Sequence, residues 1–243
     1  MPKEDKKQVA ASREILVKNQ AEKKPYRVNI CGLEFIVQPG VFSPRYFNST
    51  DIFSRNFPYR RDESFLEIGS GPGITSVLVA LRGARSVVAV DINPKAVKNT
   101  QANALLHGVQ NLVGVRVSDV FSSVSKHERF DTIYWNLPFI YVPANYSYRS
   151  VLERALYDPG YRYTQRFLRQ APRFLNKSGR LLVGFGDFGD MRTFFQLVGQ
   201  VGYSIKELAC ESGQEGGTVS FILYELHLRK QTSNGARRKT RKR

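Results

Sequence analysis

A glycine-rich loop directly after a short apolar segment constrains the fold of this chain more than any other feature. Residues 64–68 are predicted to form a β-strand, and Gly69, Gly71 and Gly73 follow it before a helical run that extends to Leu81. Glycines let the backbone turn sharply and approach a ligand closely at the carboxyl end of a strand, where open α/β sheets bind ligands. The loop therefore predicts a strand, a ligand-binding turn and a helix within an α/β fold.

Strand-like and helical segments alternate along the rest of the chain. Short apolar, β-branched runs are separated by stretches with helical periodicity, and this alternation predicts βαβ units. We therefore expect a Rossmann-like, doubly wound α/β fold with a mostly parallel, seven-stranded sheet and helices on both faces. Besides 64–68, the expected strands are 86–90, 112–117, 130–135, 180–185, 203–209 and 218–226.

Two local signals mark a hairpin and a helix. Alternating apolar residues on both sides of a Cys-Gly pair at 31–32 predict an N-terminal β-hairpin. A helix is expected over 94–107, because Asn93 is a good N-cap residue, proline suits the first helical position and Gly108 suits the position after the last turn.

Basic residues are concentrated at the two ends of the chain. The formal net charge is +16, yet residues 229–243 alone carry eight basic and no acidic side chains, and residues 1–24 carry seven basic and four acidic ones. A basic tail raises the affinity for polyanions, which favours a neighbourhood of RNA or ribosomes. A solvated tail that only promotes solubility is the alternative.

Four segments are expected. Residues 1–24 form a polar, basic segment that is flexible or marginally helical. Residues 25–60 hold the hairpin and a lead segment rich in proline and aromatic residues, 61–228 form the α/β domain, and 229–243 form a basic, disordered tail.

Composition and spacing exclude several classes of protein. Apolar residues make up 42% and charged residues 24% of the chain, as in ordinary globular proteins. No segment has the apolar run of a signal peptide or a membrane span, so we expect a soluble, cytoplasmic protein that does not bind a membrane. The two cysteines lack the spacing of a zinc site, and no metal is expected.

The loop and the next strand end together indicate the ligand. The spacing Gly-x-Gly-x-Gly departs from the dinucleotide fingerprint Gly-x-Gly-x-x-Gly, which disfavours NAD. The second strand ends in Asp91, whose carboxylate can accept both hydrogen bonds of a ribose diol, and Ile92 and Asn93 follow it. These features predict an adenosine pocket, whereas a loop that serves only packing is the alternative.

The turn after the fourth strand carries the residues for chemistry. It reads Asn136-Leu137-Pro138-Phe139. An amide side chain and backbone carbonyls here can accept hydrogen bonds from a planar NH₂ group, and Phe139 can stack on the same group. Proximity and orientation would then supply most of the rate. As an alternative, Asn136 is a simple turn residue.

The glycine loop and Asp91 together resemble the first two motifs of Rossmann-like, S-adenosylmethionine-dependent methyltransferases. The resemblance covers 64 to about 210 and implies S-adenosyl-L-methionine as the cofactor. Glu67 would lie near the methionine end, and Asp119 and Val120 beside the adenine. The cofactor-binding residues that the resemblance implies are Glu67, Gly69, Ser70, Gly71, Gly73, Asp91, Ile92, Asn93, Asp119 and Val120.

The tetrapeptide Asn-Leu-Pro-Phe resembles the Asn-Pro-Pro-Tyr/Phe signature of methyltransferases that act on amide or exocyclic amino nitrogens. The surrounding chain resembles the HemK-type glutamine methyltransferases, in particular at 39–45, 49–51, 155–160 and 167–175. This resemblance implies that Thr50 covers the cofactor, that the catalytic residues are Asn136, Pro138 and Phe139, and that the substrate is a glutamine side chain of a translation-associated protein.

Three departures from the HemK pattern leave other substrates open. Leu137 replaces the first proline, a form also found in ribosomal RNA adenine dimethyltransferases; residues 1–24 are too short for the bacterial helical domain; and the glycine-rich stretch after the catalytic motif is reduced. Nitrogen methylation is therefore better supported than glutamine itself. An amino group of adenine or guanine in RNA, a biosynthetic small molecule, and a cofactor-binding protein without turnover are the alternatives.

An aromatic and basic cluster follows the catalytic motif. We assign Leu137 and Tyr141 to substrate binding, and the cluster as a whole to a lid that stacks on a base or shapes a peptide groove. Ordinary packing of a long insertion is the alternative. The other members of the cluster are Tyr146, Tyr148, Tyr157, Tyr161, Tyr163, Arg149, Arg154 and Arg162.

Overall fold

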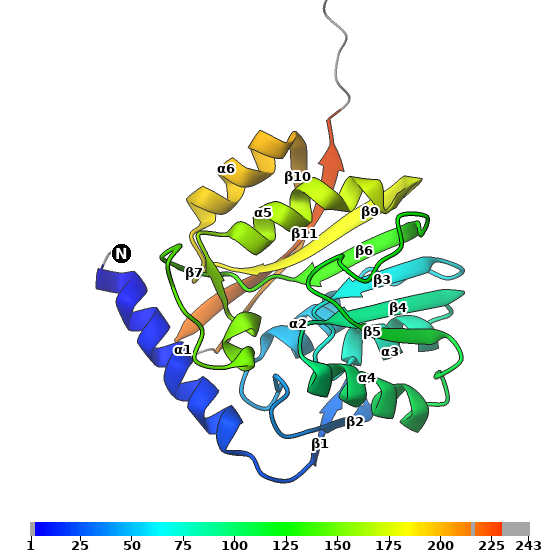
Figure 1. The fold of residues 1–243 in the computed structure, drawn as a ribbon, viewed down its shortest axis with the longest axis horizontal. Helices are drawn as coiled ribbons and strands as arrows, with labels where there is room; N and C mark the ends of the chain where they lie inside the picture. The colour runs from blue at the N-terminus through cyan, green and yellow to red at the C-terminus, as the bar shows by residue number, and fades with distance from the viewer. Residues whose placement is uncertain (1–2, 215–216, 230–243) are drawn as a thin grey trace, which may run out of the picture.

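The computed structural model describes residues 3–214 and 217–229 of the chain (Figure 1). Its helices are α1 (Lys3–Ala21), α2 (Ser49–Asn56), α3 (Ile74–Leu81), α4 (Pro94–Leu106), α5 (Arg162–Gln170) and α6 (Met191–Val201), with 3₁₀ turns η1 (Val151–Ala155) and η2 (Ala171–Arg173). Its strands are β1 (Tyr26–Ile30), β2 (Leu33–Val37), β3 (Ser64–Ile68), β4 (Ser86–Asp91), β5 (Val113–Val117), β6 (Phe130–Asn136), β7 (Ile140–Val142), β8 (Tyr157–Pro159), β9 (Leu175–Gly186), β10 (Tyr203–Gln214) and β11 (Thr218–Leu228).

A seven-stranded sheet forms the centre of the molecule, with the order β10-β11-β9-β6-β3-β4-β5. The pairs from β9 to β5 are parallel, and β11 is antiparallel to both of its neighbours. Helices α2, α3 and α4 lie on one face and α5 and α6 on the other (Figure 1). The expected Rossmann-like, mostly parallel α/β fold is confirmed.

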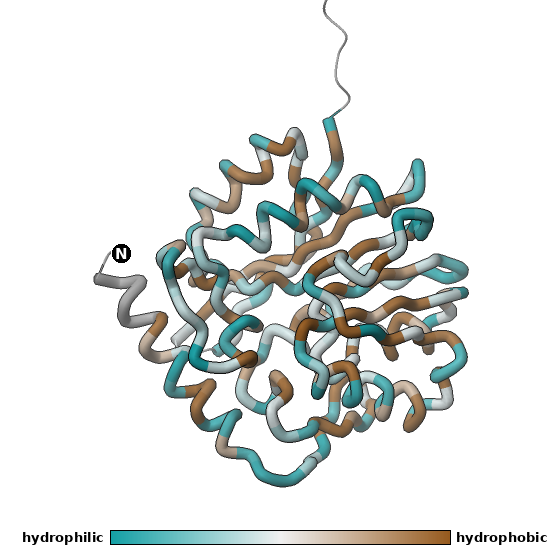
Figure 2. Tube along the Cα trace, in the orientation of Figure 1, coloured by the Kyte–Doolittle hydropathy of each residue, from teal (hydrophilic) through white to brown (hydrophobic). Residues whose placement is uncertain are grey.

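Hydrophobic residues are concentrated in the strands of this sheet, whereas the loops are largely polar (Figure 2). Every residue of β3 is buried, as expected of a strand covered by helices on both faces. Strands β9 and β10 are longer than predicted. A register shift between Phe130 and Thr132 lets β9 pair from Leu175 onward, and β10 extends as a hairpin with β11 to Gln214. These extensions depend on strand pairing, which local patterns do not reveal.

The N-terminal hairpin and the helix that follows β4 are confirmed. Strands β1 and β2 are joined by a two-residue turn in which both residues, Cys31 and Gly32, have positive φ angles. Helix α4 begins after Asn93, whose side chain accepts a hydrogen bond from the Lys95 backbone N–H, and it ends one residue earlier than predicted.

Helix α4 presents a buried polar face to the hairpin. Asn99 and Asn103 are fully buried, and their side-chain amides bind the free edge of β2. The Asn103 Oδ1 accepts from the Ile36 N–H at 2.8 Å, the Asn99 Nδ2 donates to the Ile36 carbonyl at 2.7 Å, and the Asn99 Oδ1 accepts from the Gln38 N–H at 2.8 Å. These amides satisfy backbone groups that another strand would otherwise pair.

Residues 3–21 form helix α1, and its part from Val9 onward packs on the protein, unlike the flexible or marginally helical segment expected there. Leu16 is 2% exposed, and Ser12 and Asn19 lie on the same buried face of α1. The Ser12 and Tyr157 hydroxyls are 3.0 Å apart, and the Asn19 Nδ2 donates to the Val41 carbonyl at 3.1 Å. Since most of the buried face is polar, the apolar pattern of the sequence did not reveal it.

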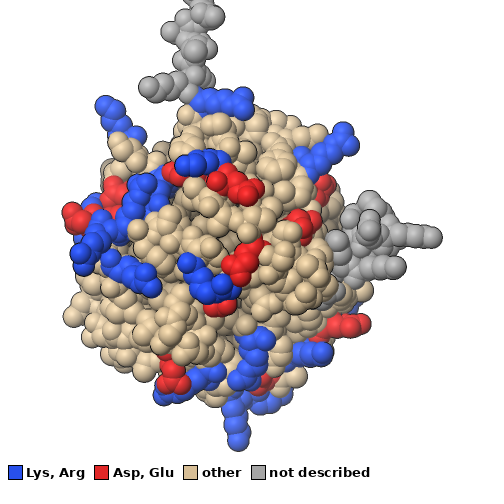
Figure 3. All heavy atoms as spheres, turned by 180° about the vertical axis from the view of Figure 1, so that it is seen from behind, with Lys and Arg blue, Asp and Glu red and all other residues tan. Residues whose placement is uncertain are grey.

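Charged side chains are distributed unevenly. Seen from behind, Lys and Arg side chains gather along one side of the molecule (Figure 3). Exposed arginines occur in the loops before β3 and β4, at the amino ends of the parallel strands: Arg60, Arg61, Arg82 and Arg85. The predicted disordered tail, 229–243, lies outside the described residues except for Arg229.

Within the described part of the chain, no helix combines the length and the apolar character needed to cross a bilayer.

If α1 is packed as the structure shows, truncating its one fully buried apolar side chain must destabilise the protein. We expect Leu16→Ala to lower the free energy of unfolding by about 2–4 kcal/mol. The matched control is Val17→Ala, because Val17 is 57% exposed on the same helix, and its effect should stay within about 0.5 kcal/mol. Urea denaturation measures the free energy of unfolding of both variants. Equal losses in the two variants would contradict the packing of α1.

Candidate active site

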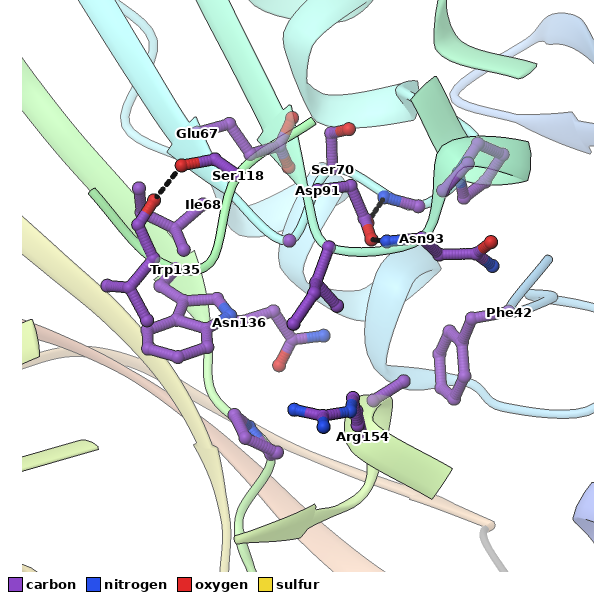
Figure 4. Close-up of a pocket in the computed structure, with 18 of the residues that line it drawn as sticks. Phe42, Glu67, Ile68, Ser70, Asp91, Asn93, Ser118, Trp135, Asn136 and Arg154 are labelled. Atoms are coloured by element: carbon purple, nitrogen blue, oxygen red, sulfur yellow. Dashed lines mark hydrogen bonds between the residues drawn. The ribbon is translucent and has the colours of Figure 1, made fainter. Parts of the chain in front are cut away.

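One pocket lies at the carboxyl ends of the central parallel strands. Its walls come from the ends of β3, β4 and β6, the loop after β5, the lead segment before β3, and η1 (Figure 4). This is the edge at which open α/β sheets bind ligands, because the strand order reverses between β3 and β6. Among the lining residues are Phe42, Thr50, Glu67, Gly69, Ser70, Gly71, Asp91, Ile92, Asn93, Asp119, Val120, Trp135, Asn136, Pro138, Arg154 and Tyr163.

The glycine loop is held against helix α4. The Thr100 hydroxyl donates to the Gly71 carbonyl at 3.1 Å, and the Asn103 Nδ2 donates to the Pro72 carbonyl at 2.8 Å. A Cβ atom on Gly73, whose φ is +82°, would lie 2.8 Å from the Thr100 Cα. Gly73 is therefore required for close packing of α3 on α4, whereas a Cβ atom on Gly71 would meet open space.

Asp91 links the loop to the end of β4. Its Oδ2 accepts a hydrogen bond from the Gly71 N–H and its Oδ1 one from the Asn93 N–H, both at 2.8 Å. Burial raises the pKa of this carboxyl, and the backbone N–H donors oppose that shift. Each carboxylate oxygen keeps a further lone pair that can accept from a ligand hydroxyl in the pocket.

Glu67 lies at the inner end of the pocket, on β3. It is 4% exposed and accepts a hydrogen bond from the Ser76 N–H at 3.0 Å, in the first turn of α3. Burial raises the pKa of Glu67 to about 8, although the hydrogen bonds from Ser76 lower it. The carboxyl is therefore largely protonated at neutral pH when no cation lies beside it.

Asn136, the last residue of β6, points into the pocket (Figure 4). Its Nδ2 donates to the Ser49 hydroxyl at 3.4 Å, whereas its buried Oδ1 has no hydrogen-bond partner within the described residues. A buried acceptor without a donor costs free energy, so this oxygen is suited to accept a hydrogen bond from a bound molecule.

The turn after Asn136 is held rigidly on both sides. The Leu137 N–H donates to the Gly184 carbonyl of β9 at 3.0 Å. The Tyr161 hydroxyl donates to the Phe139 carbonyl at 2.6 Å and accepts from the Asp190 N–H at 2.8 Å. These contacts fix where Asn136 and Pro138 meet the pocket.

Most residues predicted to bind the cofactor lie together in this pocket. Thr50 and Pro138, predicted from the resemblance, also line it. Gly73, Leu137, Phe139 and Tyr141 do not line it.

The structure differs from the sequence-based assignment for those four residues. Phe139 is 3% exposed and packs its ring against Phe185 and Phe221, so it cannot stack on a substrate in this conformation. Leu137 is 1% exposed in the core, and Tyr141 contacts the ring of Tyr161. Side chains alternate along an extended turn, so only Asn136 and Pro138 face the pocket.

Several pocket residues were not assigned to the site from the sequence. Phe42 lies in 39–45, one of the segments that resemble the HemK-type enzymes, but it was not assigned individually. Trp135 offers no signal beyond being aromatic, since the direction of its side chain depends on the tertiary fold. Arg154 and Tyr163 belong to the predicted aromatic and basic cluster. The rest of that cluster is largely packed: Tyr146 donates to Glu153, and Tyr157 contacts Ser12 of α1.

In the part of the chain that the structure describes, no three acidic, cysteine or histidine side chains are grouped so as to hold a metal ion.

Comparison with known proteins identifies the family. The methyltransferase small domain family matches residues 32–204, which span β2 to the start of β10. The chain belongs to this family. It is an S-adenosylmethionine-dependent methyltransferase with a Rossmann-like fold, as the sequence predicted.

Proteins similar to this methyltransferase carry names that state different substrates. A chain of Methanocaldococcus jannaschii named as a protein N5-glutamine methyltransferase is 31% identical over 154 residues, 63% of this chain and 75% of that one. The release factor glutamine methyltransferase of Geobacter sulfurreducens is 28% identical over 77% of this chain and 69% of its own. Among solved structures, the 16S rRNA N2 G1207 methyltransferase of T. thermophilus, in complex with AdoMet and guanosine, has a similar fold, with a TM-score of 0.58 at 19% sequence identity. The match covers 85% of this chain and 50% of the T. thermophilus chain.

The pocket of this methyltransferase suits its cofactor. The open space at Gly71 leaves room for a ligand beside the loop, and Asp91 offers acceptors for a ribose diol. The buried Glu67 provides a carboxyl where the methionine part, with its cationic groups, is expected. On these features we propose that the cofactor lies along the ends of β3 and β4.

The raised pKa of Glu67 makes the stability of the ligand-free protein depend on pH. The ordinary pKa is 4.5, so between about 4.5 and 8 the folded protein retains a proton that the unfolded chain releases. Stability is therefore lost as the pH rises through this window. We expect Glu67→Gln to gain stability relative to the wild type across it, by up to roughly a few kcal/mol, in urea denaturation at about pH 5 and pH 8.5.

The control for this change is Glu14→Gln, because Glu14 is exposed on α1. Its effect on the free energy of unfolding should stay within about 0.5 kcal/mol, as for other exposed side chains. A Glu67→Gln difference that does not change with pH would contradict the raised pKa.

Proposed function

We propose that this methyltransferase transfers a methyl group to a planar nitrogen, and that the acceptor is the side-chain amide of a protein glutamine. The observation that carries the proposal is the buried Asn136 Oδ1 without a hydrogen-bond partner in the described chain, beside the cofactor pocket. An NH₂ group that donates to this oxygen would satisfy it and would be held next to the cofactor.

The residues of this chain would act mainly by positioning the acceptor nitrogen beside the cofactor. S-adenosylmethionine supplies an electrophilic methyl group on a sulfonium centre. A hydrogen bond from the acceptor NH₂ to Asn136 Oδ1 draws the nitrogen lone pair out of conjugation with the carbonyl and toward that methyl group. The N–CH₃ bond would form as the S–CH₃ bond breaks, with S-adenosylhomocysteine as the leaving group. Because the amide nitrogen would lose its proton only after it becomes cationic, water can take that proton and no strong base is needed at Asn136. The rigid turn at Pro138 keeps the acceptor plane fixed.

The glutamine assignment is supported by the names of the two relatives described above and by the resemblance to HemK-type enzymes. A second candidate acceptor is the amino group of a base in RNA. It is favoured by Leu137, which stands where the glutamine enzymes have proline, and by the strongly basic composition of the chain.

Transfer of labelled methyl from S-adenosylmethionine into a cell lysate distinguishes these acceptors. We expect label in protein, at a glutamine residue found by peptide mass spectrometry, and at least a hundredfold less with Asn136→Ala. The Asn136→Ala variant should still bind the cofactor, which shows that it is folded. Label found in RNA or in small molecules instead of protein would show that the acceptor is not a glutamine. Full turnover by Asn136→Ala would show that Asn136 has no catalytic role.

Cofactor binding can be followed directly, because Trp135 is the only tryptophan of the chain and lines the pocket. We expect Asp91→Ala to raise the Kd for S-adenosylhomocysteine, measured by tryptophan fluorescence, about tenfold or more, since the variant loses acceptors for the ribose. Asp62→Ala, which changes an exposed residue outside the pocket, is the control and should bind normally. Unchanged binding by Asp91→Ala would refute the ribose contact.

A further inference from the structure

Arg154 brings a positive charge into the pocket from outside the cofactor-binding strands. It lies in η1, in the segment that follows the catalytic turn, and is half-buried. Its guanidinium group points into the pocket on the side where Asn136 lies (Figure 4). The expected cofactor contacts lie instead at the ends of β3 and β4, so Arg154 faces the acceptor side of the pocket.

Aromatic rings hold this guanidinium group in place. It lies 4.6 Å from the ring centre of Tyr148 and 5.8 Å from that of Tyr163, and its Nη1 donates to the Tyr163 hydroxyl at 3.0 Å. An arginine fixed between rings loses little freedom on binding a ligand, and its remaining N–H groups form a planar fork.

Arg154 belongs to no ion pair among the described residues, and two acidic groups of its segment or of the pocket lining have other partners. Glu153, its neighbour in the chain, is buried and accepts from the Tyr146 hydroxyl and the Arg149 N–H. Asp119 forms an ion pair with Arg166. The fork of Arg154 therefore faces the pocket without a partner of opposite charge.

We propose that Arg154 binds a carboxylate of the acceptor, so that the preferred substrate is a peptide in which an acidic residue lies next to the methylated glutamine. The proposal deepens the proposed function and rests on it for the glutamine. A carboxylate matches the planar fork with two parallel hydrogen bonds, and the position beside Asn136 places it near the acceptor nitrogen.

Four short peptides separate this proposal from the proposed function. Each peptide has Asp or Asn at one position and Gln or Ala at the next. Their binding to the complex of the protein with S-adenosylhomocysteine is measured by Trp135 fluorescence. We expect the Asp peptides to bind about tenfold tighter than the Asn peptides, whether Gln or Ala follows. A preference for Gln over Ala tests the glutamine acceptor independently.

Two arginine variants test whether Arg154 causes the preference for Asp peptides. Arg154→Gln should abolish the preference for Asp. Arg162→Gln is the matched control, because Arg162 also donates to the Tyr163 hydroxyl, at 3.2 Å, but is exposed and does not line the pocket. It should retain the preference.

Three results would overturn the proposal. The first is equal binding of Asp and Asn peptides by the wild type. The second is that Arg154→Gln binds S-adenosylhomocysteine more weakly but binds 5′-methylthioadenosine as the wild type does. Because 5′-methylthioadenosine lacks the amino acid part, this result would mean that Arg154 holds the carboxylate of the cofactor. The third is Arg154-dependent binding of a short RNA oligonucleotide without discrimination among the peptides.

Discussion

The site depends on the buried polar face of helix α4. Asn99, Thr100 and Asn103 are all fully buried, and their side chains bind the edge of β2 on one side and the glycine loop on the other. Each of these contacts satisfies a backbone group that would otherwise be buried without a partner. A single helix therefore fixes the hairpin, the loop and the start of α3 together, and the pocket at this edge of the sheet takes its shape from that helix.

Two buried carboxyl groups at this edge work in different environments. Asp91 is held by backbone N–H groups of the loop and of the turn after β4, so its position is set by the main chain. Glu67 lies deeper, where burial dominates and raises its pKa to about 8. The parallel sheet brings both carboxyl groups together because its strands end at the same edge.

The acceptor side is built from irregular structure rather than from the sheet. The segment from β7 to β8 forms its own two-stranded parallel pair and rests on α1 through Tyr157 and Tyr146. It carries Arg154 into the pocket, while Tyr161 ties the turn after Asn136 to the start of α6. The shape of this side thus relies on contacts between segments more than a hundred residues apart, such as Ser12 with Tyr157.

Local periodicity, helix caps and strand-end motifs were enough to predict the fold class, the seven strands, the hairpin, the bounds of α4 to within one residue and the gathering of the strand-end residues in one pocket. The packing of α1 could not be predicted in this way, because Ser12 and Asn19 on its buried face are polar. The same holds for the burial of Phe139 in the core and for the role of Gly73 in helix packing. The direction of Arg154 was also beyond the sequence, because a side chain in an irregular segment is aimed by its neighbours in space.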